Sequence, residues 1–397
     1  MSDLAPSPDR FDLAVLRREL GARLKPKTAE SRTTVMGAGS DDLEEGRSYL
    51  SSMSEGGWAT PLWPVELGGM SATKDQAAAV ASVLSEFEVP DLYPFSIGIG
   101  IVGHTLIDYA TDEQLSRWLP TMRTGAEIWC QLFSEPDAGS DLANLGARAV
   151  RDGDEWVING SKVWSSRSMY SQYGWLLART DPDVPKHRGI TAFVVDMSAP
   201  GMDIRPLRQI NEDAHFAEVF MTDVRVPDID RVGGEGDGWR LAITTLGYER
   251  GGVATRPMGK FDQLVDLAAD RDLGTDPLVR QRLMNLKSLS EVTAWTNARA
   301  NAKAEAGVPG PEGSGGKLRY SPLLKETGQL AKDLQGPLGM LTEEADDAWH
   351  TLFLTGPSMS IRGGTDEIQR NIVGERVLGL PKEPDVSREV AFKDIGR

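Results

Sequence analysis

The feature that most constrains this 397-residue chain is a double change of hydrophobic period along its length. Residues 10–127 carry apolar side chains at three- and four-residue spacings, which is typical of amphipathic helices. Residues 128–237 instead contain short runs rich in β-branched and aromatic residues, separated by turn pairs such as Asp152-Gly153. The helical period returns from Gly238. This order predicts an α+β fold with a β unit between two helical units.

We therefore expect three domains, helical over 1–127, β over 128–237 and helical over 238–397. Within the β unit, residues 151–164 predict a hairpin at Asp152-Gly153 and a second turn at Asn159-Gly160 that leads into a third strand. The stretch VPGPEGSGGK at 308–317 predicts a flexible connector between two helices. Thr111, followed by two acidic residues, predicts a helix N-cap.

The composition excludes several classes of function. Lys and Arg number 43 against 59 Asp and Glu, and the net charge of -16 disfavours binding to nucleic acids or membrane surfaces. The first residues predict no signal peptide, and the absence of an 18-residue apolar run predicts no membrane insertion. The single Cys130 fits a reducing cytoplasm, and the scattered histidines predict no metal site.

Residues 98–103 match the dinucleotide-binding pattern GxGxxG, but their surroundings argue against that function. The pattern requires a strand before it, a helix after it and an acidic residue about 20 positions further on. Here the preceding region is helical and contains Pro90 and Pro94, and the next acidic residue is already Asp108. We expect these glycines to permit close packing between helices.

Three segments carry groups suited to chemistry. The first, residues 129–141, ends in the turn SEPDAGSD, whose backbone could approach a flat ring or a phosphate; a structural turn is the simpler interpretation. The second, residues 159–166, ends a strand in a tryptophan and two serines, where a core tryptophan is the simpler interpretation. The third, residues 361–376, reads as a Gly-Gly turn and a helix capped by Thr365, and helix N-termini can bind anions.

Together, SEPDAGSD, INGSKVW and GGTDEIQRNIVGER resemble the acyl-CoA dehydrogenase family in order and spacing, over residues 50–383. The resemblance implies an N-terminal helical domain, a middle β-barrel-like domain and a C-terminal four-helix bundle. It also implies that FAD lies between the β domain and the C-terminal helices. The implied reaction converts an acyl-CoA thioester to the trans-2-enoyl-CoA, with hydride passing to flavin N5.

The resemblance assigns roles to particular residues. Phe133 and Ser134 would contact the flavin pyrimidine, Trp164 would flank the ring, and Ser166 would bind near N5. Thr365 and Glu367 would touch FAD from the C-terminal region, and Arg271 would bind the pyrophosphate of a neighbouring subunit's FAD. Substrate contacts would come from Ser140 and Arg250.

The chain also departs from the family pattern. Gly274 stands where the family usually has phenylalanine, and Arg282 where it has glutamine. No glycine-rich segment of the QxxGGxG type is evident before residue 358. These departures concern the part of the FAD site that is shared between subunits.

The catalytic base is expected at an unusual place. A carboxylate in a dry pocket must take the α-proton, because desolvation raises carboxylate basicity. Many members carry it in a YEGT-like turn, but this chain has Gly363 there, which could still offer its N–H group to the thioester oxygen. A minority branch, including isovaleryl-type enzymes, carries the glutamate in an LxxER context, which residues 246–250 match. We therefore assign Glu249 as the base.

Three functional alternatives follow from the resemblance. The first is a homo-oligomeric dehydrogenase, dimer or tetramer, that passes electrons to an electron-transfer flavoprotein. The second is a flavin oxidase on the same fold. The third is a subunit of a heterotetramer that shares FAD sites with a related chain, as in bacterial branches acting on sterols or other bulky acyl-CoA thioesters.

Overall fold

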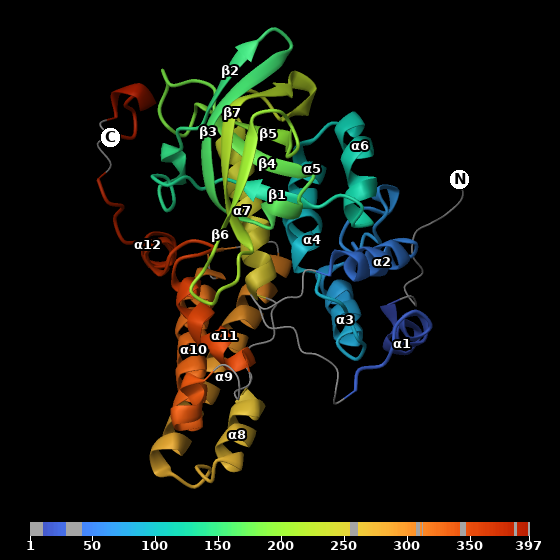
Figure 1. Cartoon of the computed structure of the whole chain (residues 1–397), viewed down its shortest axis with the longest axis vertical. Coiled ribbons are helices and arrows are strands. Elements are labelled where there is room, and N and C mark those ends of the chain that lie inside the picture. The colour runs from blue at the N-terminus through green and yellow to red at the C-terminus, as the bar shows by residue number, and fades with distance from the viewer. Residues whose placement is uncertain are drawn as a thin grey trace.

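The computed structural model describes residues 11–28, 42–254, 261–306, 310–311, 313–341, 347–384 and 387–395, without the side chains of 250–254, 304–305 and 347. Helices come first, then strands, then helices again, as the sequence predicts (Figure 1). The division at residues 127 and 237 stays a prediction. The N-terminal helices are α1 (Leu13–Gly21), α2 (Leu43–Ser54), α3 (Lys74–Leu84), α4 (Tyr93–Ile97), α5 (Gly103–Tyr109) and α6 (Asp112–Arg123).

The GxGxxG segment is helical, as expected, and not a dinucleotide-binding turn. Gly98–Val102 forms a π-helical turn, η3, that joins α4 to α5. A Cβ atom on Gly103 would lie 2.3 Å from the indole of Trp63, and one on Gly98 would lie 3.2 Å from Met122. Close packing therefore requires glycine at Gly103 and favours it at Gly98, whereas Gly100 has open space around it.

The strands form one mixed sheet in the order β6-β7-β3-β2-β4-β5-β8, with β1 paired in parallel to β4. The pairings β2–β3, β3–β7, β6–β7, β4–β5 and β5–β8 are antiparallel. The strands are β1 (Trp129–Leu132), β2 (Arg148–Asp152), β3 (Glu155–Ser166), β4 (Tyr173–Arg179), β5 (Ile190–Asp196), β6 (Met202–Leu207), β7 (Phe216–Pro227) and β8 (Arg231–Val232).

Both faces of the central strands are buried. In β4, Trp175 and Leu177 face the core shared with the helices, whereas Leu176 and Ala178 face a second core enclosed by the sheet. Successive side chains of a strand point to opposite faces, so a strand buried on both sides needs an unbroken apolar run. This explains why β4 and β5 are almost wholly apolar in sequence.

The prediction of a turn at Asn159-Gly160 is wrong, because β3 continues through these residues. The pairing of β3 with β7 has a bulge between Ile158 and Gly160. Gly160 has φ +149°, and a Cβ atom there would lie 2.7 Å from Ala147. The Asn159 amide pairs with Asp223 on β7 in both directions, at 3.0 and 2.9 Å. The Asn-Gly pair therefore forms a bulge rather than a turn.

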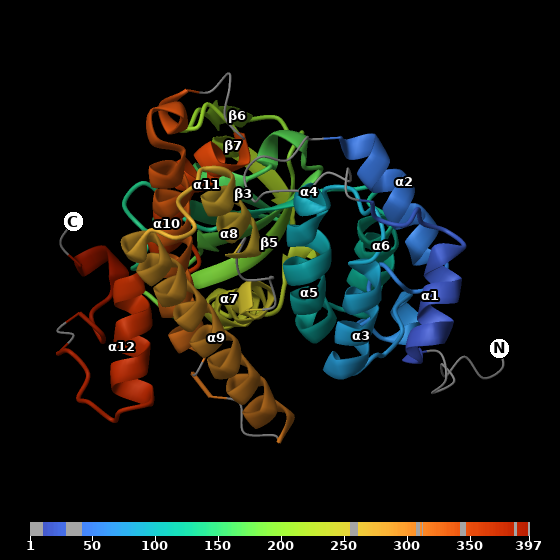
Figure 2. The same ribbon diagram turned by 90° about the horizontal axis from the view of Figure 1, so that it is seen from below.

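The C-terminal helices are α7 (Gly238–Ala254), α8 (Phe261–Asp270), α9 (Pro277–Glu305), α10 (Gly313–Gln335), α11 (Asp347–Thr355) and α12 (Asp366–Arg376). Helices α8 to α11 pack around their own apolar core, whereas α7 contributes to the core shared with the sheet. Figure 2 shows α7 beside α5 and beneath the sheet.

The prediction of a flexible connector at 308–317 is wrong for its second half, because α10 begins at Gly313. Ser314 and Lys317 are buried, and a Cβ atom on Gly316 would lie 2.2 Å from Asn297 of α9. The glycines here let two helices approach each other. Residues 307–309 and 312 lie outside the described part of the chain.

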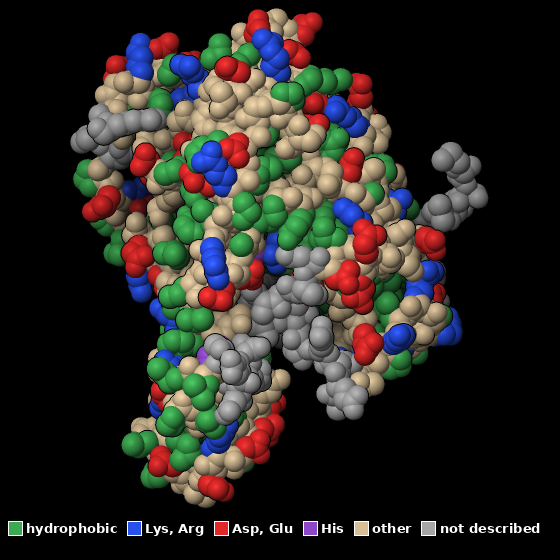
Figure 3. All heavy atoms as spheres, in the orientation of Figure 1, with side chains coloured by type: hydrophobic (Ala, Val, Ile, Leu, Met, Phe, Trp, Pro, Cys, Tyr) green, Lys and Arg blue, Asp and Glu red, His purple; other side chains and the backbone are tan. Residues whose placement is uncertain are grey.

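Charged side chains of both signs are interspersed over the face seen in Figure 3. Among the described helices, none combines the length and the apolar character that a bilayer span requires.

We predict that Thr111→Ala lowers the free energy of unfolding by about 1 kcal/mol. Thr111 accepts a hydrogen bond from the backbone of Gln114 at 3.3 Å, and the Gln114 side chain accepts one from Thr111 N at 3.0 Å, which confirms the expected N-cap. Urea denaturation of the alanine and Thr111→Ser variants measures the difference. Equal stabilities of the two variants would contradict the capping role.

Candidate active site

A fully buried lysine ties the SEPDAGSD turn to β3. Lys162 Nζ donates to Phe133 O at 3.1 Å and to Glu135 Oε1 at 2.7 Å. Glu135 also accepts hydrogen bonds from Gly146 N and Ala147 N, at 2.7 and 2.9 Å. Burial lowers the pKa of Lys162, and the Glu135 carboxylate opposes that shift. These bonds fix the position of the turn relative to β3.

Directly after this lysine, β3 presents an exposed indole. Val163 N donates to Ser134 O at 2.9 Å, which places the turn beside Trp164. Trp164 has φ +61° at an irregularity of the β3–β7 pairing, and 60 % of its surface is exposed. Its ring meets Phe216 edge-on, with centroids 5.9 Å apart. A non-glycine residue held at positive φ is strained, and such strain is concentrated at functional sites.

The two serines after Trp164 differ in environment. Ser166 pairs with Phe216 of β7 and is partly exposed. Ser165 Oγ is buried, and no hydrogen-bond partner for it exists within the described residues. The C-terminal end of β3 therefore combines an exposed aromatic ring with two small hydroxyl residues.

The loop before α12 is built on two glycines in the left-handed region, Gly363 at φ +65° and Gly364 at φ +83°. Gln369 is fully buried and donates from Nε2 to Gly363 O at 3.3 Å. Thr365 caps α12, as expected, by accepting from Ile368 N at 3.1 Å. The loop is thus fixed by the helix that follows it.

Glu249 lies on the inward-facing side of α7. Ala242, Thr245 and Glu249 follow one another at spacings of three and four residues, so they lie on the same side of the helix. Ala242 and Thr245 are fully buried, and Glu249 is partly buried. A Cβ atom built on Gly363 would lie 3.6 Å from Glu249 Oε1. The structure therefore brings together the two positions, 249 and 363, that sequence comparison offers for the base.

Other expected site residues lie further from this centre or in different surroundings. The Phe133 ring is buried in the core, and Ser140 is exposed on its turn. Glu367 is exposed and pairs with Arg370 at 3.0 Å. Arg271 is exposed and directly follows α8. The Arg250 side chain lies outside the described residues.

Arg282, one of the departures from the family pattern, has a structural role. Its guanidinium contacts Glu326 at 2.8 Å and Asp333 at 2.7 Å, and both carboxylates belong to α10. The arginine therefore joins α9 to α10 through two ion pairs.

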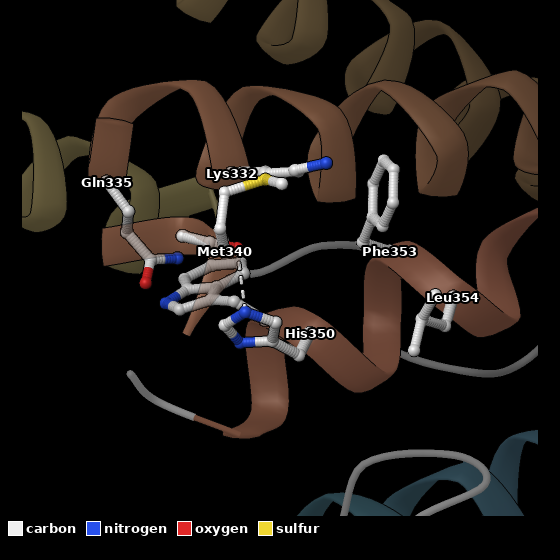
Figure 4. A pocket seen from close by; sticks show the side chains of 8 residues that line it. Lys332, Gln335, Met340, His350, Phe353 and Leu354 are labelled. Carbon is white, nitrogen blue, oxygen red and sulfur yellow. Dashed lines mark hydrogen bonds between the residues drawn. The ribbon is translucent and has the colours of Figure 1, made fainter. Parts of the chain in front are cut away.

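Sequence reasoning missed a pocket beyond α10. Gln335 and Gly339 occupy the first and fifth positions of a QxxGGxG pattern, but Leu338 and Leu341 replace its glycines, so the pattern escapes detection. His350 Nε2 donates to Gly339 O at 2.7 Å. The pocket is lined by Lys332, Gln335, Gly339, Met340, Trp349, His350, Phe353 and Leu354 (Figure 4). Its volume of about 180 Å³ is below the roughly 300–1,000 Å³ of most ligand sites.

The residues around Trp164 fit a flavin. A flat ring with polar edges needs an apolar face and hydrogen-bonding groups nearby. The exposed Trp164 indole supplies the face, and the partly exposed Ser166 supplies a hydroxyl group. Trp164, Ser166 and the Ser134 turn would hold the ring.

Three family models match the chain in sequence order. They describe the acyl-CoA dehydrogenase N-terminal domain at residues 20–126, the middle domain at 130–224 and the C-terminal domain at 236–378.

Two kinds of relatives agree with these models. Acyl-CoA dehydrogenase IpdE1 of Mycobacterium tuberculosis is 38% identical, covering 86% of this chain and 89% of its own. The solved structure titled Tcur3481-Tcur3483 steroid ACAD has a TM-score of 0.79 at 28% identity, covering 96% of this chain and 100% of its own. The ChsE4-ChsE5 complex of Mycobacterium tuberculosis has a TM-score of 0.74 at 27% identity, with the same coverage.

We predict that Lys162→Met lowers the free energy of unfolding by about 3–5 kcal/mol, because it leaves the Glu135 carboxylate without its buried partner. The double variant Lys162→Met/Glu135→Gln should lose less, since no charge stays behind. Urea denaturation of both variants makes the comparison. A single variant as stable as the double variant would show that the ion pair does not hold this turn.

Proposed function

This chain belongs to the acyl-CoA dehydrogenase family of FAD enzymes, and we propose on that premise that Glu249 is its general base. The proposed reaction removes one hydrogen each from the α- and β-carbons of an acyl-CoA thioester and yields the trans-2-enoyl-CoA. The proposed electron acceptor is an electron-transfer flavoprotein.

One observation carries the assignment of the base. A side chain at position 363 would begin 3.6 Å from the Glu249 carboxylate. A carboxylate from α7 thus reaches the space that a residue of the loop before α12 would enter. Glycine at 363 leaves that space open to Glu249.

Different residues of this chain would act on the α-proton and on the thioester oxygen. Glu249 accepts the α-proton through its carboxylate, which stands on the inward face of α7. The Gly363 N–H group donates to the thioester oxygen as negative charge develops there. The Gln369 bond to Gly363 O holds the loop in place, so the donor does not have to reorganise during the reaction. FAD, when bound, supplies the acceptor for the hydrogen that leaves the β-carbon.

The remaining contacts are proposed from the family pattern. Phe133, Ser134, Trp164 and Ser166 would hold the flavin ring from the β domain. Thr365 and Glu367 would touch FAD from the N-terminal end of α12. Ser140 and Arg250 would bind the acyl-CoA. Among the relatives, a steroid enzyme supports a bulky acyl group as substrate.

We predict that Glu249→Gln slows flavin reduction by about 10²–10⁴-fold, the usual contribution of a positioned general base. The amide keeps the shape of the side chain but accepts the proton poorly. Anaerobic mixing of the FAD-loaded variant with acyl-CoA, followed by flavin absorbance, measures the rate. Flavin reduction at the wild-type rate would eliminate Glu249 as the base.

Two further variants sharpen this test. Glu113→Gln removes an exposed carboxylate on α6 and should leave the rate unchanged. Glu249→Gln/Gly363→Glu returns a carboxylate to the same space and should recover part of the lost rate. The recovery is partial because a non-glycine residue at φ +65° costs roughly 1–2 kcal/mol.

A second candidate is that the chain forms half of a mixed oligomer. Two structural relatives are titled as assemblies of two different chains. Helix α9 also exposes a series of apolar residues. The exposed fractions of their surfaces are 71 % for Leu278, 55 % for Met284, 39 % for Val292 and 67 % for Trp295. Apolar side chains exposed along one helix are typical of surfaces that another chain covers.

The mixed-oligomer candidate predicts that the chain expressed alone binds less than one FAD per polypeptide. Co-expression with a related chain should restore the full content, because each subunit would complete the other's site. The flavin absorbance per mole of protein measures this content. A full complement of FAD in the chain alone, together with dehydrogenase activity, would favour the homo-oligomer.

A further inference from the structure

We propose that Tyr248 and Asp108 are positioning residues that fix the Glu249 carboxylate by joining α7 to α5. This inference rests on the proposed function, since it takes Glu249 as the base. Tyr248 precedes Glu249 directly, and its hydroxyl group donates to Asp108 Oδ2 at 2.9 Å. The two residues are 140 positions apart in sequence, so the bond joins two separate parts of the fold.

Aromatic packing adds a second constraint on Tyr248. Its ring stacks on His104 of α5, with centroids 4.8 Å apart and planes inclined by 20°. On its other side, His104 meets the indole of Trp63 edge-on at 6.2 Å. Trp63 is almost wholly buried. The phenol therefore lies against a ring that is itself fixed by the core.

The charge states of this cluster suit a fixed contact. Burial, reinforced by the bond to Asp108, raises the pKa of Tyr248 to about 12, so its hydroxyl group stays a donor at neutral pH. Burial lowers the pKa of His104, although Asp108 opposes this, so the ring is neutral at the same pH. The contact therefore keeps one donor, one acceptor and one neutral stacking partner.

Two other hydrogen bonds join the same helices further from Glu249. Tyr109 Oη lies 3.0 Å from Thr244 Oγ1, and Thr105 Oγ1 lies 3.1 Å from Thr245 Oγ1. Of these three hydrogen bonds, Tyr248–Asp108 lies nearest to Glu249 in sequence. Without it, Tyr248 keeps its stacking on His104 but loses its hydrogen bond to α5, and the Glu249 carboxylate gains freedom to move. Displacement of a catalytic group by about 1 Å can cost 10²-fold in rate.

The test compares Tyr248→Phe with Tyr109→Phe in the FAD-loaded enzyme. Each variant removes one phenol hydroxyl between the same two helices, but only the first lies beside the base. We expect Tyr248→Phe to slow flavin reduction by about 10–10²-fold with KM changed less than about twofold, whereas Tyr109→Phe keeps the wild-type rate. Both should keep Tm values close to that of the wild type, because each loses one hydrogen bond. The decrease should be larger for Tyr248→Phe, since the acceptor of Tyr248 is a carboxylate.

The outcomes separate this inference from the proposed function. If the wild type reduces its flavin with acyl-CoA and Glu249→Gln does not, the proposed function stands. Equal rates for Tyr248→Phe and the wild type would then overturn the positioning role alone. A wild type whose flavin no acyl-CoA reduces would overturn both.

A second pair of variants covers the case in which Tyr248→Phe does not fold. Asp108 is exposed, so its replacement leaves the core intact. Asp108→Asn keeps an oxygen acceptor for the phenol and should retain most of the rate, whereas Asp108→Ala should show the slow rate. Equal rates in these two variants would also overturn the inference.

Discussion

The candidate site depends on one buried ammonium group. Lys162 is fully buried and takes its partners, the Phe133 carbonyl and the Glu135 carboxylate, from the turn after β1. A buried charge is tolerated only when such partners are complete. Any shift of the turn would leave the ammonium unsatisfied, so the Ser134 backbone and Trp164 stay side by side. The part of the proposed flavin site that the β domain would supply follows from this constraint.

The C-terminal part of the candidate site depends on the two glycines before α12. Gly363 and Gly364 adopt positive φ angles, and the absence of a side chain at 363 leaves room for a carboxylate from α7. In the proposed mechanism the loop supplies backbone groups, while a separate helix supplies the base. The position of the proposed base therefore depends on how the neighbouring part of α7 is held against α5, so we expect the Tyr248–Asp108 bond to bear on catalysis.

Local patterns predicted much of this structure. The order of helices and strands, the Thr111 cap and the helical GxGxxG segment each depend on residues close together in sequence. The Asn159-Gly160 turn and the 308–317 connector failed, because contacts with Ala147 and Asn297, distant in sequence, decide those conformations. The approach of Glu249 to Gly363 is a tertiary distance, and only family resemblance pointed to it.

The most direct measurement of the central claim is the flavin absorbance of the FAD-loaded protein, mixed without air with paired acyl-CoA thioesters. Saturated thioesters with hydrogens on both the α- and β-carbons should bleach the flavin. Their 2,3-unsaturated counterparts, from which one hydrogen has already been removed at each of these carbons, should leave it oxidised. Bleaching by both members of a pair, or by neither across a range of bulky and simple acyl groups, would contradict the account.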